Sequence, residues 1–128
     1  MPRYDLHSHS TCSDGLLAPA AMVARAAARG VDVYALTDHD ETGGLAEARA
    51  AADAAGIELV PGAELSVSWE DLTIHIVALR IDPGNAVLAA GLASIRAGRT
   101  LRAQRVGQRG ADALRWPTPA FRAPTRAR

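Results

Sequence analysis

The amino-acid sequence predicts an α/β fold built around parallel strands. Short runs rich in β-branched, aromatic or large aliphatic residues alternate with alanine-rich helical segments, and the opening order is strand, helix, strand, helix, strand. Such alternation is typical of a parallel α/β sheet or barrel. The chain has 128 residues, of which 48% are hydrophobic, so we expect one domain with a substantial core rather than a multidomain enzyme.

The first three elements are expected within the first 37 residues. Residues 3–7, a short run with Tyr and Leu, are expected to form the first strand. A helix over residues 20–29 is indicated by its alanine content, with Pro19 in the first turn and Gly30 at its end. Residues 31–37 (VDVYALT) are the second expected strand, because β-branched and aromatic residues favour the pleated conformation.

The second helix is expected over the alanine-rich residues 43–55, and Gly56 ends it. After it we expect a third strand that Pro61-Gly62 ends, then a hairpin, and then a long helix. We expect the third strand over residues 57–60, the two hairpin strands over 65–69 and 72–79, and the long helix from 85 to about 113. One side of this helix is expected to carry Val87, Leu88, Leu92 and Ile95.

Charge is divided unevenly along the chain. Residues 1–95 contain 5 Arg and 13 acidic residues, whereas residues 96–128 contain 9 Arg and one acid, so net charges of −8 and +8 cancel. The pattern that predicts helices and strands ends at about residue 113, so we expect the domain to span residues 1–113. Residues 114–128 are expected to be a basic, Pro- and Arg-rich tail that is disordered or out of frame.

The sequence predicts a cytoplasmic protein with no membrane contact. Its single cysteine, Cys12, excludes an internal disulfide, and no apolar run approaches the roughly 18 residues of a membrane span. The N-terminal residues lack the apolar stretch that is typical of a signal peptide.

Histidines and carboxylates follow the expected strands. His7 and His9 form an H-x-H pair at the end of the first strand, and residues i and i+2 of an extended segment point the same way. His39 follows the second strand and Glu64 the third. The carboxyl ends of parallel strands meet at one face, so these side chains are expected to converge. With one acid from the following loop and one histidine from a later strand, the candidate metal ligands are His7, His9, Asp14, His39, Glu64 and His75.

This set of side chains indicates a particular chemistry. Imidazole and carboxylate together suit Zn, Mn or Fe, and a carboxylate can bridge two ions. A two-metal site activates water at neutral pH and stabilises charge on a displaced phosphate oxygen.

Each candidate also has a simpler interpretation when it is taken alone. Asp14 before Gly15 suits a turn, and Glu64 suits an exposed acid after a Pro-Gly turn. His75 on an apolar strand is typical of a buried histidine whose hydrogen bonds are satisfied. The TDHD segment could be a helix N-cap cluster in which Asp40 or Thr42 accepts backbone hydrogen bonds.

Four segments, DLHSHSTCSDG, ALTDHD, PGAELS and TIHIVAL, resemble the N-terminal half of the PHP (polymerase and histidinol phosphatase) superfamily. The likeness is to its small bacterial metal-dependent phosphoesterases, which hydrolyse nucleoside 3′,5′-bisphosphates and trim the 5′ ends of short RNA. It extends from about Tyr4 to about Ala113. The resemblance implies the N-terminal half of a distorted seven-stranded (β/α) barrel.

The resemblance also implies cofactors, substrates and residue roles. Up to three divalent ions, Mn, Fe or Zn, would activate water for attack on a phosphorylated small molecule, a nucleoside bisphosphate or a short RNA. His7 and His9 would bind one ion, with Glu64 bridging it to a second. His75 would belong to the second ion, and Asp14 with His39 to a third. It does not identify which residues of this chain bind substrate.

The sequence departs from the family after His75, where no further histidine occurs. The family's second half supplies another His, a phosphate-binding Arg motif and an Asp-x-His pair. A barrel of this kind needs about 200 residues or more, so 128 residues cannot close it. We therefore expect a truncated chain with impaired phosphoesterase activity and with open strand edges that favour aggregation. The alternative is a half-barrel that a second chain completes.

Three other functions remain open at this point. The first is an inactive fragment that binds metal without hydrolysis. The second is another chemistry of the same superfamily, such as histidinol-phosphate hydrolysis. The third is a nucleic-acid-binding helix, because arginines recur at helical spacing, although no aromatic residue lies among them for base stacking. The arginines concerned are Arg96, Arg99, Arg102, Arg105 and Arg109.

Overall fold

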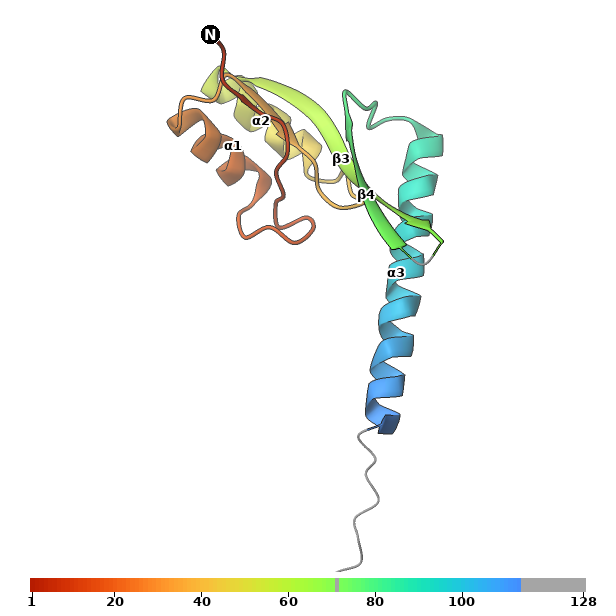
Figure 1. Ribbon diagram of the computed structural model, residues 1–128. Coiled ribbons are helices and arrows are strands. Elements are labelled where there is room, and N and C mark those ends of the chain that lie inside the picture. The colour runs from red at the N-terminus through yellow and green to blue at the C-terminus, as the bar shows by residue number, and fades with distance from the viewer. Residues whose placement is uncertain (71, 114–128) are drawn as a thin grey trace, which may run out of the picture. The chain divides into compact units, whose positions relative to one another are not determined.

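The computed structural model describes residues 1–70 and 72–113, with side chains up to residue 101 and at Gln104. The chain separates into two compact units, Met1–Ala97 and Gly98–Arg128. The sheet, two helices and the start of a third lie in the first unit (Figure 1). The basic tail expected over 114–128 lies outside the described residues.

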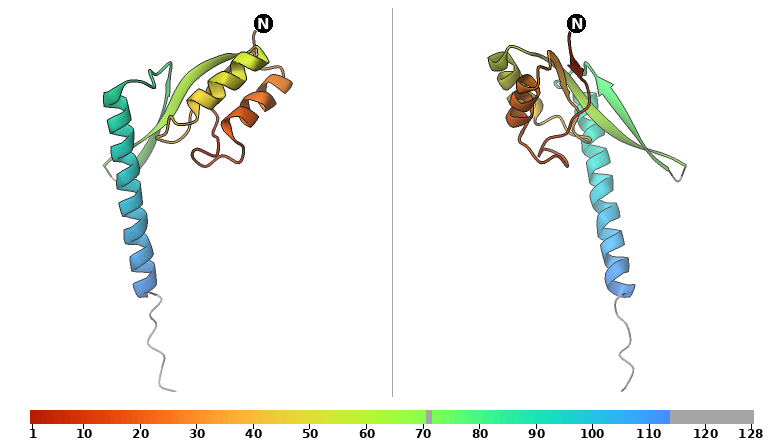
Figure 2. Two further views of the ribbon diagram at one scale, coloured as in Figure 1. Left: turned by 180° about the vertical axis from the view of Figure 1, so that it is seen from behind. Right: turned by 60° about the vertical axis from the view of Figure 1, so that its left-hand side comes forward.

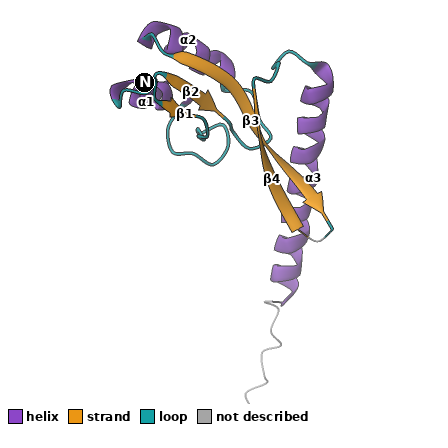
Figure 3. Cartoon of the chain, turned by 45° about the horizontal axis from the view of Figure 1, so that its top comes forward, coloured by secondary structure: helices purple, strands orange, loops and turns teal. Residues whose placement is uncertain are grey.

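The sheet has four strands in the order β1-β2-β3-β4: β1 (Tyr4–Asp5), β2 (Val33–Leu36), β3 (Glu58–Trp69) and β4 (Leu72–Leu79). The first three strands are parallel to one another, and β4 is antiparallel to β3. Figure 3 shows β3 running from beside β2 into the hairpin with β4. The predicted α/β class is confirmed, as a curled sheet whose outer strands β1 and β4 each pair with one neighbour among the described residues.

The expectation that Pro61-Gly62 ends the third strand is wrong. β3 continues through both residues and changes partner there: Pro61 is the last residue paired with β2, and Gly62 is the first paired with β4. Pro61 has no N–H to donate, but its carbonyl accepts a 3.2 Å hydrogen bond from Ile81 N. A Cβ at Gly62 would lie 2.8 Å from Thr37 Cγ2 and 2.9 Å from Ala78 O. Glycine therefore allows the close approach of chains at this crossing.

The hairpin is confirmed, with Trp69 paired to Leu72. Glu70 adopts a positive φ of 53°, as a tight connection between two strands requires. Asp71, the other residue of the expected turn, lies outside the described residues.

Two helices cover one face of the parallel strands (Figure 2). Helix α1 (Pro19–Ala28) begins at the predicted proline. Helix α2 (Leu45–Ala55) ends at Gly56, whose φ of 70° is the left-handed conformation that glycine adopts without strain. The core between helices and sheet consists of Val23, Ala26, Tyr34, Leu36, Leu45, Ala48, Ala52 and Leu59.

The third helix, α3 (Ala86–Ala113), has the expected extent. Its first turn is capped by Asn85, whose Oδ1 accepts a 3.0 Å hydrogen bond from Leu88 N. Leu92 is buried, but Val87 is 82% exposed, contrary to the predicted apolar side. Val87 is adjacent to Leu88 in sequence, and consecutive helical residues point about 100° apart, so the two cannot share a narrow stripe. Within the described residues no helix is both long and apolar enough to cross a membrane.

Strand β4 and the second half of β3 carry apolar side chains that the described residues leave uncovered. Trp69 and Leu72 are 65% and 66% exposed. β4 contains no Asp, Glu, Lys or Arg, and among the described residues it pairs only with β3. The concave side of the sheet holds an open groove lined by Tyr4, Leu6, Val33, Glu58, Val60, Leu79 and Arg80. The open edge expected of this sheet is therefore present at β4 among the described residues.

Candidate metal centre

Backbone pairing brings three segments together beyond the ends of the parallel strands. Thr37 N donates to Ser8 O at 2.9 Å, so the chain after β1 continues beside the chain after β2. His39 pairs with Glu64 as an isolated parallel bridge, and Asp40 N donates to Glu64 O at 2.9 Å. The segments that carry His7, His9, His39 and Glu64 therefore lie side by side.

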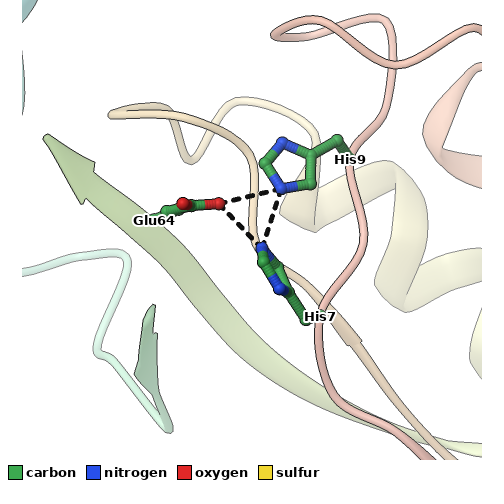
Figure 4. A group of neighbouring side chains, drawn as sticks. All are labelled: His7, His9 and Glu64. Atoms are coloured by element: carbon green, nitrogen blue, oxygen red, sulfur yellow. Dashed lines mark hydrogen bonds and ion pairs between the residues drawn. The ribbon is translucent and has the colours of Figure 1, made fainter. Parts of the chain in front are cut away.

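His7 and His9 both face the Glu64 carboxylate (Figure 4). The Nε2 atoms of the two rings lie 2.7 and 2.9 Å from Glu64 Oε2, and 3.0 Å from each other. β1 ends at Asp5, so the H-x-H pair follows the strand instead of ending it as expected, and Glu64 lies within β3 instead of beyond a strand end. The alternation of side chains along the chain still points both imidazoles to one side.

The other candidate ligands surround the same carboxylate. His75 Nδ1 lies 3.5 Å from Glu64 Oε1, the second oxygen of that group. Asp14 approaches from the loop: its Oδ1 lies 3.0 Å from His9 Nδ1 and its Oδ2 lies 3.7 Å from His39 Nε2. The imidazole rings follow one another with centroids 4.5 to 5.0 Å apart, in the order His7, His9, His39, His75. The structure thus brings all six candidates together.

Burial differs sharply across this cluster. The Glu64 side chain is 8% exposed, whereas those of His7, His75 and Asp14 are 54%, 44% and 69% exposed. Glu64 is therefore not the exposed acid of the simpler interpretation, and His75 is not a buried core histidine. The cluster is built on a buried carboxylate and is open to water at its rim.

The helix-cap interpretation of the TDHD segment is also wrong. Helix α2 begins after Gly44 with no side-chain cap. Asp40 Oδ1 instead accepts a 2.7 Å hydrogen bond from Ser66 N, on the neighbouring strand. The acids that flank His39 therefore support neighbouring segments of the site instead of the helix: Asp40 accepts from strand β3 and Asp38 accepts from the loop that follows His9.

The six side chains form three overlapping ligand groups. These are His7, His9 and Glu64; His39, Glu64 and His75; and His9, Asp14 and His39. A neutral imidazole has one lone pair for a metal, so His9 and His39 can each serve only one of their two groups at a time. The first two groups share only Glu64, which has two oxygens, and can be complete together. The third competes with both of them for imidazoles.

The carboxyl groups of the cluster have lowered pKa values. Burial alone raises the pKa of Glu64, but the hydrogen bond with His7 and the charges of His39, His7 and His9 outweigh burial and lower it from its ordinary 4.5. For Asp14, burial also acts upward, and the charges of His39 and His9 lower the pKa from its ordinary 3.8. Both groups are carboxylates at neutral pH, the form that binds cations.

The donor set fits a divalent metal ion. Imidazole nitrogens and carboxylate oxygens are the ligands that Zn, Mn and Fe accept in proteins. His9 Nδ1 is buried and has no partner in hydrogen-bond geometry among the described residues, although Asp14 Oδ1 lies 3.0 Å away. The His9 ring thus presents Nε2 to Glu64 and Nδ1 to Asp14, and a neutral imidazole can offer a lone pair to a cation on either side, one side at a time.

Sequence reasoning missed the residues that support this cluster. Asp38 is 2% exposed and accepts hydrogen bonds from Ser10 and Ser13, in the loop between His9 and Asp14. Ser8, between His7 and His9, donates to Ala35 O at 2.7 Å. The only signal in the sequence is the recurrence of serine in HSHSTCSD, which by itself is also typical of an exposed loop.

Comparison with known proteins identifies a family for this arrangement. A family model described as PHP domain matches residues 5–101. The chain is 57% identical over 107 residues to a 3′,5′-nucleoside bisphosphate phosphatase of Chromobacterium violaceum, and the aligned region covers 84% of this chain and 38% of that protein. It is 49% identical over 107 residues to a 5′-3′ exoribonuclease of Haemophilus influenzae, with 84% and 39% covered.

Solved structures show the same likeness. An amidohydrolase structure from Chromobacterium violaceum, with bound sulfate and no metal, superposes with a TM-score of 0.80 at 55% identity, over 87% of this chain and 39% of that one. A structure from Bifidobacterium adolescentis, proposed to be a metal-dependent phosphoesterase, superposes with a TM-score of 0.79 at 33% identity, with the same coverage. The chain thus spans about 38 to 39% of the length of these relatives.

Proposed function

This chain belongs to the PHP domain family, and from that premise we propose that its histidine and carboxylate cluster is a metal centre for the hydrolysis of phosphate esters. One observation carries the proposal. Glu64 is a buried carboxylate with Oε2 directed at His7 and His9 and Oε1 directed at His75, so one group faces ligands on two sides. A carboxylate in that position is suited to bridge two ions.

Each side chain has a role in this proposal. His7 and His9 hold one ion, His75 holds the second, and Glu64 bridges them. Asp14 and His39 belong to a third ion. Divalent ions in such a centre lower the pKa of coordinated water and neutralise charge on phosphate oxygens. The sheet supplies rigidity, because Glu64 is held by backbone hydrogen bonds on a core strand.

The substrate class rests on the relatives' names. A nucleoside 3′,5′-bisphosphate or the 5′ end of a short RNA would present a phosphate ester to the open rim of the cluster, where His7, Asp14 and His75 are exposed. The centre would take Mn, Fe or Zn.

The 128-residue chain by itself is proposed to turn over substrate weakly. Its three ligand groups overlap at His9 and His39, so they cannot all be complete at once, and the side chains of His7, His75 and Asp14 are 44 to 69% exposed. Incomplete coordination binds ions loosely and orients phosphate poorly. The partial PHP domain is proposed to span residues 1–113, of which the family model covers 5–101.

The proposal is tested by metal content and turnover on one sample. The full chain is stripped with chelator and reloaded with Mn²⁺. Bound metal and phosphate release from adenosine 3′,5′-bisphosphate are then measured for the unaltered chain, Glu64→Gln and Glu58→Gln. Glu58 is an exposed glutamate of the same strand outside the cluster, so it controls for the chemical change.

We expect Mn²⁺ binding and slow metal-dependent release in the unaltered chain and in Glu58→Gln. Glu64→Gln should lose affinity by at least about tenfold, because two of the three groups contain Glu64. A chain that binds no Mn²⁺ would contradict the metal centre. Binding without phosphate release would leave a metal-binding fragment and contradict the hydrolytic part of the proposal.

A further inference from the structure

Asp38 is a buried carboxylate that lies outside the ligand cluster. All the side-chain hydrogen bonds that the structure describes for it are donated by one loop, which follows His9. Asp38 Oδ1 lies 2.6 Å from Ser10 N and 2.7 Å from Ser13 Oγ, and both groups donate to it. Asp38 Oδ2 accepts from Ser10 Oγ at 2.7 Å. Charge-assisted hydrogen bonds are roughly twice as strong as neutral ones, so Asp38 is a firm anchor for this loop.

Ser10 accepts hydrogen bonds from three other residues of the loop. It is fully buried, and its carbonyl accepts hydrogen bonds from Ser13 N at 3.1 Å and from Gly15 N at 2.8 Å. Its hydroxyl accepts a third, from Cys12 N at 3.1 Å. The backbone of residues 10–15 is therefore tied to Ser10, and Ser10 is tied to Asp38.

The two ends of this loop carry members of the ligand cluster. His9 precedes Ser10, and Asp14 precedes Gly15. A Cβ at Gly15 would overlap the His9 carbonyl, so the loop crosses directly over the backbone of His9. This crossing brings the largely exposed Asp14 carboxylate to 3.0 Å from His9 and 3.7 Å from His39.

We propose that Asp38 is a positioning residue for the metal centre: by holding Ser10 and Ser13 it fixes the loop so that Asp14 faces His9 and His39. The inference rests on the proposed metal-dependent function. Asp38 is not one of the candidate ligands, so its replacement removes no ligand and acts only through the loop that carries His9 and Asp14 at its ends. His75 lies outside the loop and is unaffected.

The size of the effect follows from the number of hydrogen bonds removed. Asp38→Asn retains one acceptor oxygen and turns an amide donor toward Ser10 or Ser13. Asp38→Ala removes all three hydrogen bonds. Partners that orient metal ligands typically change metal affinity about 10- to 100-fold, so we expect about tenfold weaker binding for Asp38→Asn and a larger loss for Asp38→Ala.

The test is a Mn²⁺ titration of the full chain, with free ion followed by electron paramagnetic resonance and folding checked by circular dichroism. The variants are Asp38→Asn, Ser10→Ala, the double variant, Ser13→Ala and Val23→Ala. Val23 lies in the helix-covered core and controls for lost stability alone. Ser13→Ala removes one partly exposed hydroxyl, which donates to Asp38 and also lies 3.4 Å from Asp14 Oδ1, so it remains informative on the position of Asp14 if a variant of Asp38 or Ser10 does not fold.

The expected result is weaker Mn²⁺ binding in Asp38→Asn, Ser10→Ala and Ser13→Ala but not in Val23→Ala. The double variant should bind no more weakly than the worse of its two parents, because both substitutions break the same connection. Affinities equal to that of the unaltered chain in folded Asp38→Asn and Ser13→Ala would overturn the inference while leaving the metal centre intact. An unaltered chain that binds no Mn²⁺ would instead overturn the proposed function, and the inference with it.

Discussion

Replacing Gly62 by alanine tests how β3 passes from one partner strand to the other. The added Cβ would lie 2.8 Å from Thr37 Cγ2, 2.9 Å from Ala78 O and 3.2 Å from Leu36 O. Two of these atoms are backbone oxygens of paired strands. Thr37 cannot rotate away without losing the hydrogen bonds that its Oγ1 makes with Ser8 N at 3.1 Å and Ser8 O at 3.0 Å.

Overpacking of this kind costs about 1 to 3 kcal/mol in free energy of unfolding. For a domain of this size each kcal/mol lowers the melting temperature by about 4 to 8 °C. The same substitution at Gly91, in α3, meets no atom within 4 Å and should stabilise by about 0.5 to 1 kcal/mol, because alanine favours the helix. The two substitutions are chemically identical and have opposite expected signs.

Urea unfolding followed by circular dichroism measures both variants against the unaltered chain. A midpoint for Gly62→Ala at or above that of the unaltered chain would refute the close crossing. A destabilised Gly91→Ala would show that adding a methyl group is harmful wherever it is placed, and the effect at Gly62 would then carry no information on the strand.

Three further predictions follow from the same contacts. In the metal-free chain the lowered pKa of Glu64 contributes stability that is present above its ordinary pKa of 4.5 and is lost as pH falls through the lowered value. The free energy of unfolding, measured at a series of acidic pH values, should therefore fall less steeply in Glu64→Gln, and identical curves would contradict this. Gly15→Ala should weaken Mn²⁺ binding, measured by titration, because its Cβ would displace the chain that carries Asp14, and unchanged affinity would exclude that crossing. Leu36→Ala should cost about 2 to 5 kcal/mol in urea unfolding, since Leu36 is 1% exposed in the core, and a cost under about 1 kcal/mol would argue against that packing.

Local sequence patterns predicted correctly the helix ends that depend only on the backbone preferences of nearby residues. The start of α1 at Pro19 and the end of α2 at Gly56 follow from the preference of proline for the first helical turn and of glycine for the position after the last turn. The six candidate ligands also come from pattern and resemblance, and the structure places them together.

Long-range contacts decided what the sequence could not predict. Pro61-Gly62 is the usual sign of a strand end, yet here a change of pairing partner keeps the strand continuous. Asp38 was indistinguishable from a loop acid because its partners, Ser10 and Ser13, lie 28 and 25 residues away. Helical geometry alone shows that Val87 and Leu88 cannot share a narrow stripe, but which side of α3 is buried depends on contacts that are distant in the sequence.

The position of Glu64 inside β3 links metal occupancy to the melting of the whole sheet. Its backbone N–H donates to Asp38 O at 3.1 Å and its carbonyl accepts from Asp40 N at 2.9 Å, so the backbone that carries this side chain cannot leave the centre without unpairing the strand. An ion held by this group and absent from the unfolded chain adds about 1.4 kcal/mol of stability for each tenfold excess over its dissociation constant. Melting curves recorded across a series of divalent cations would therefore rank the ions by affinity without any substrate.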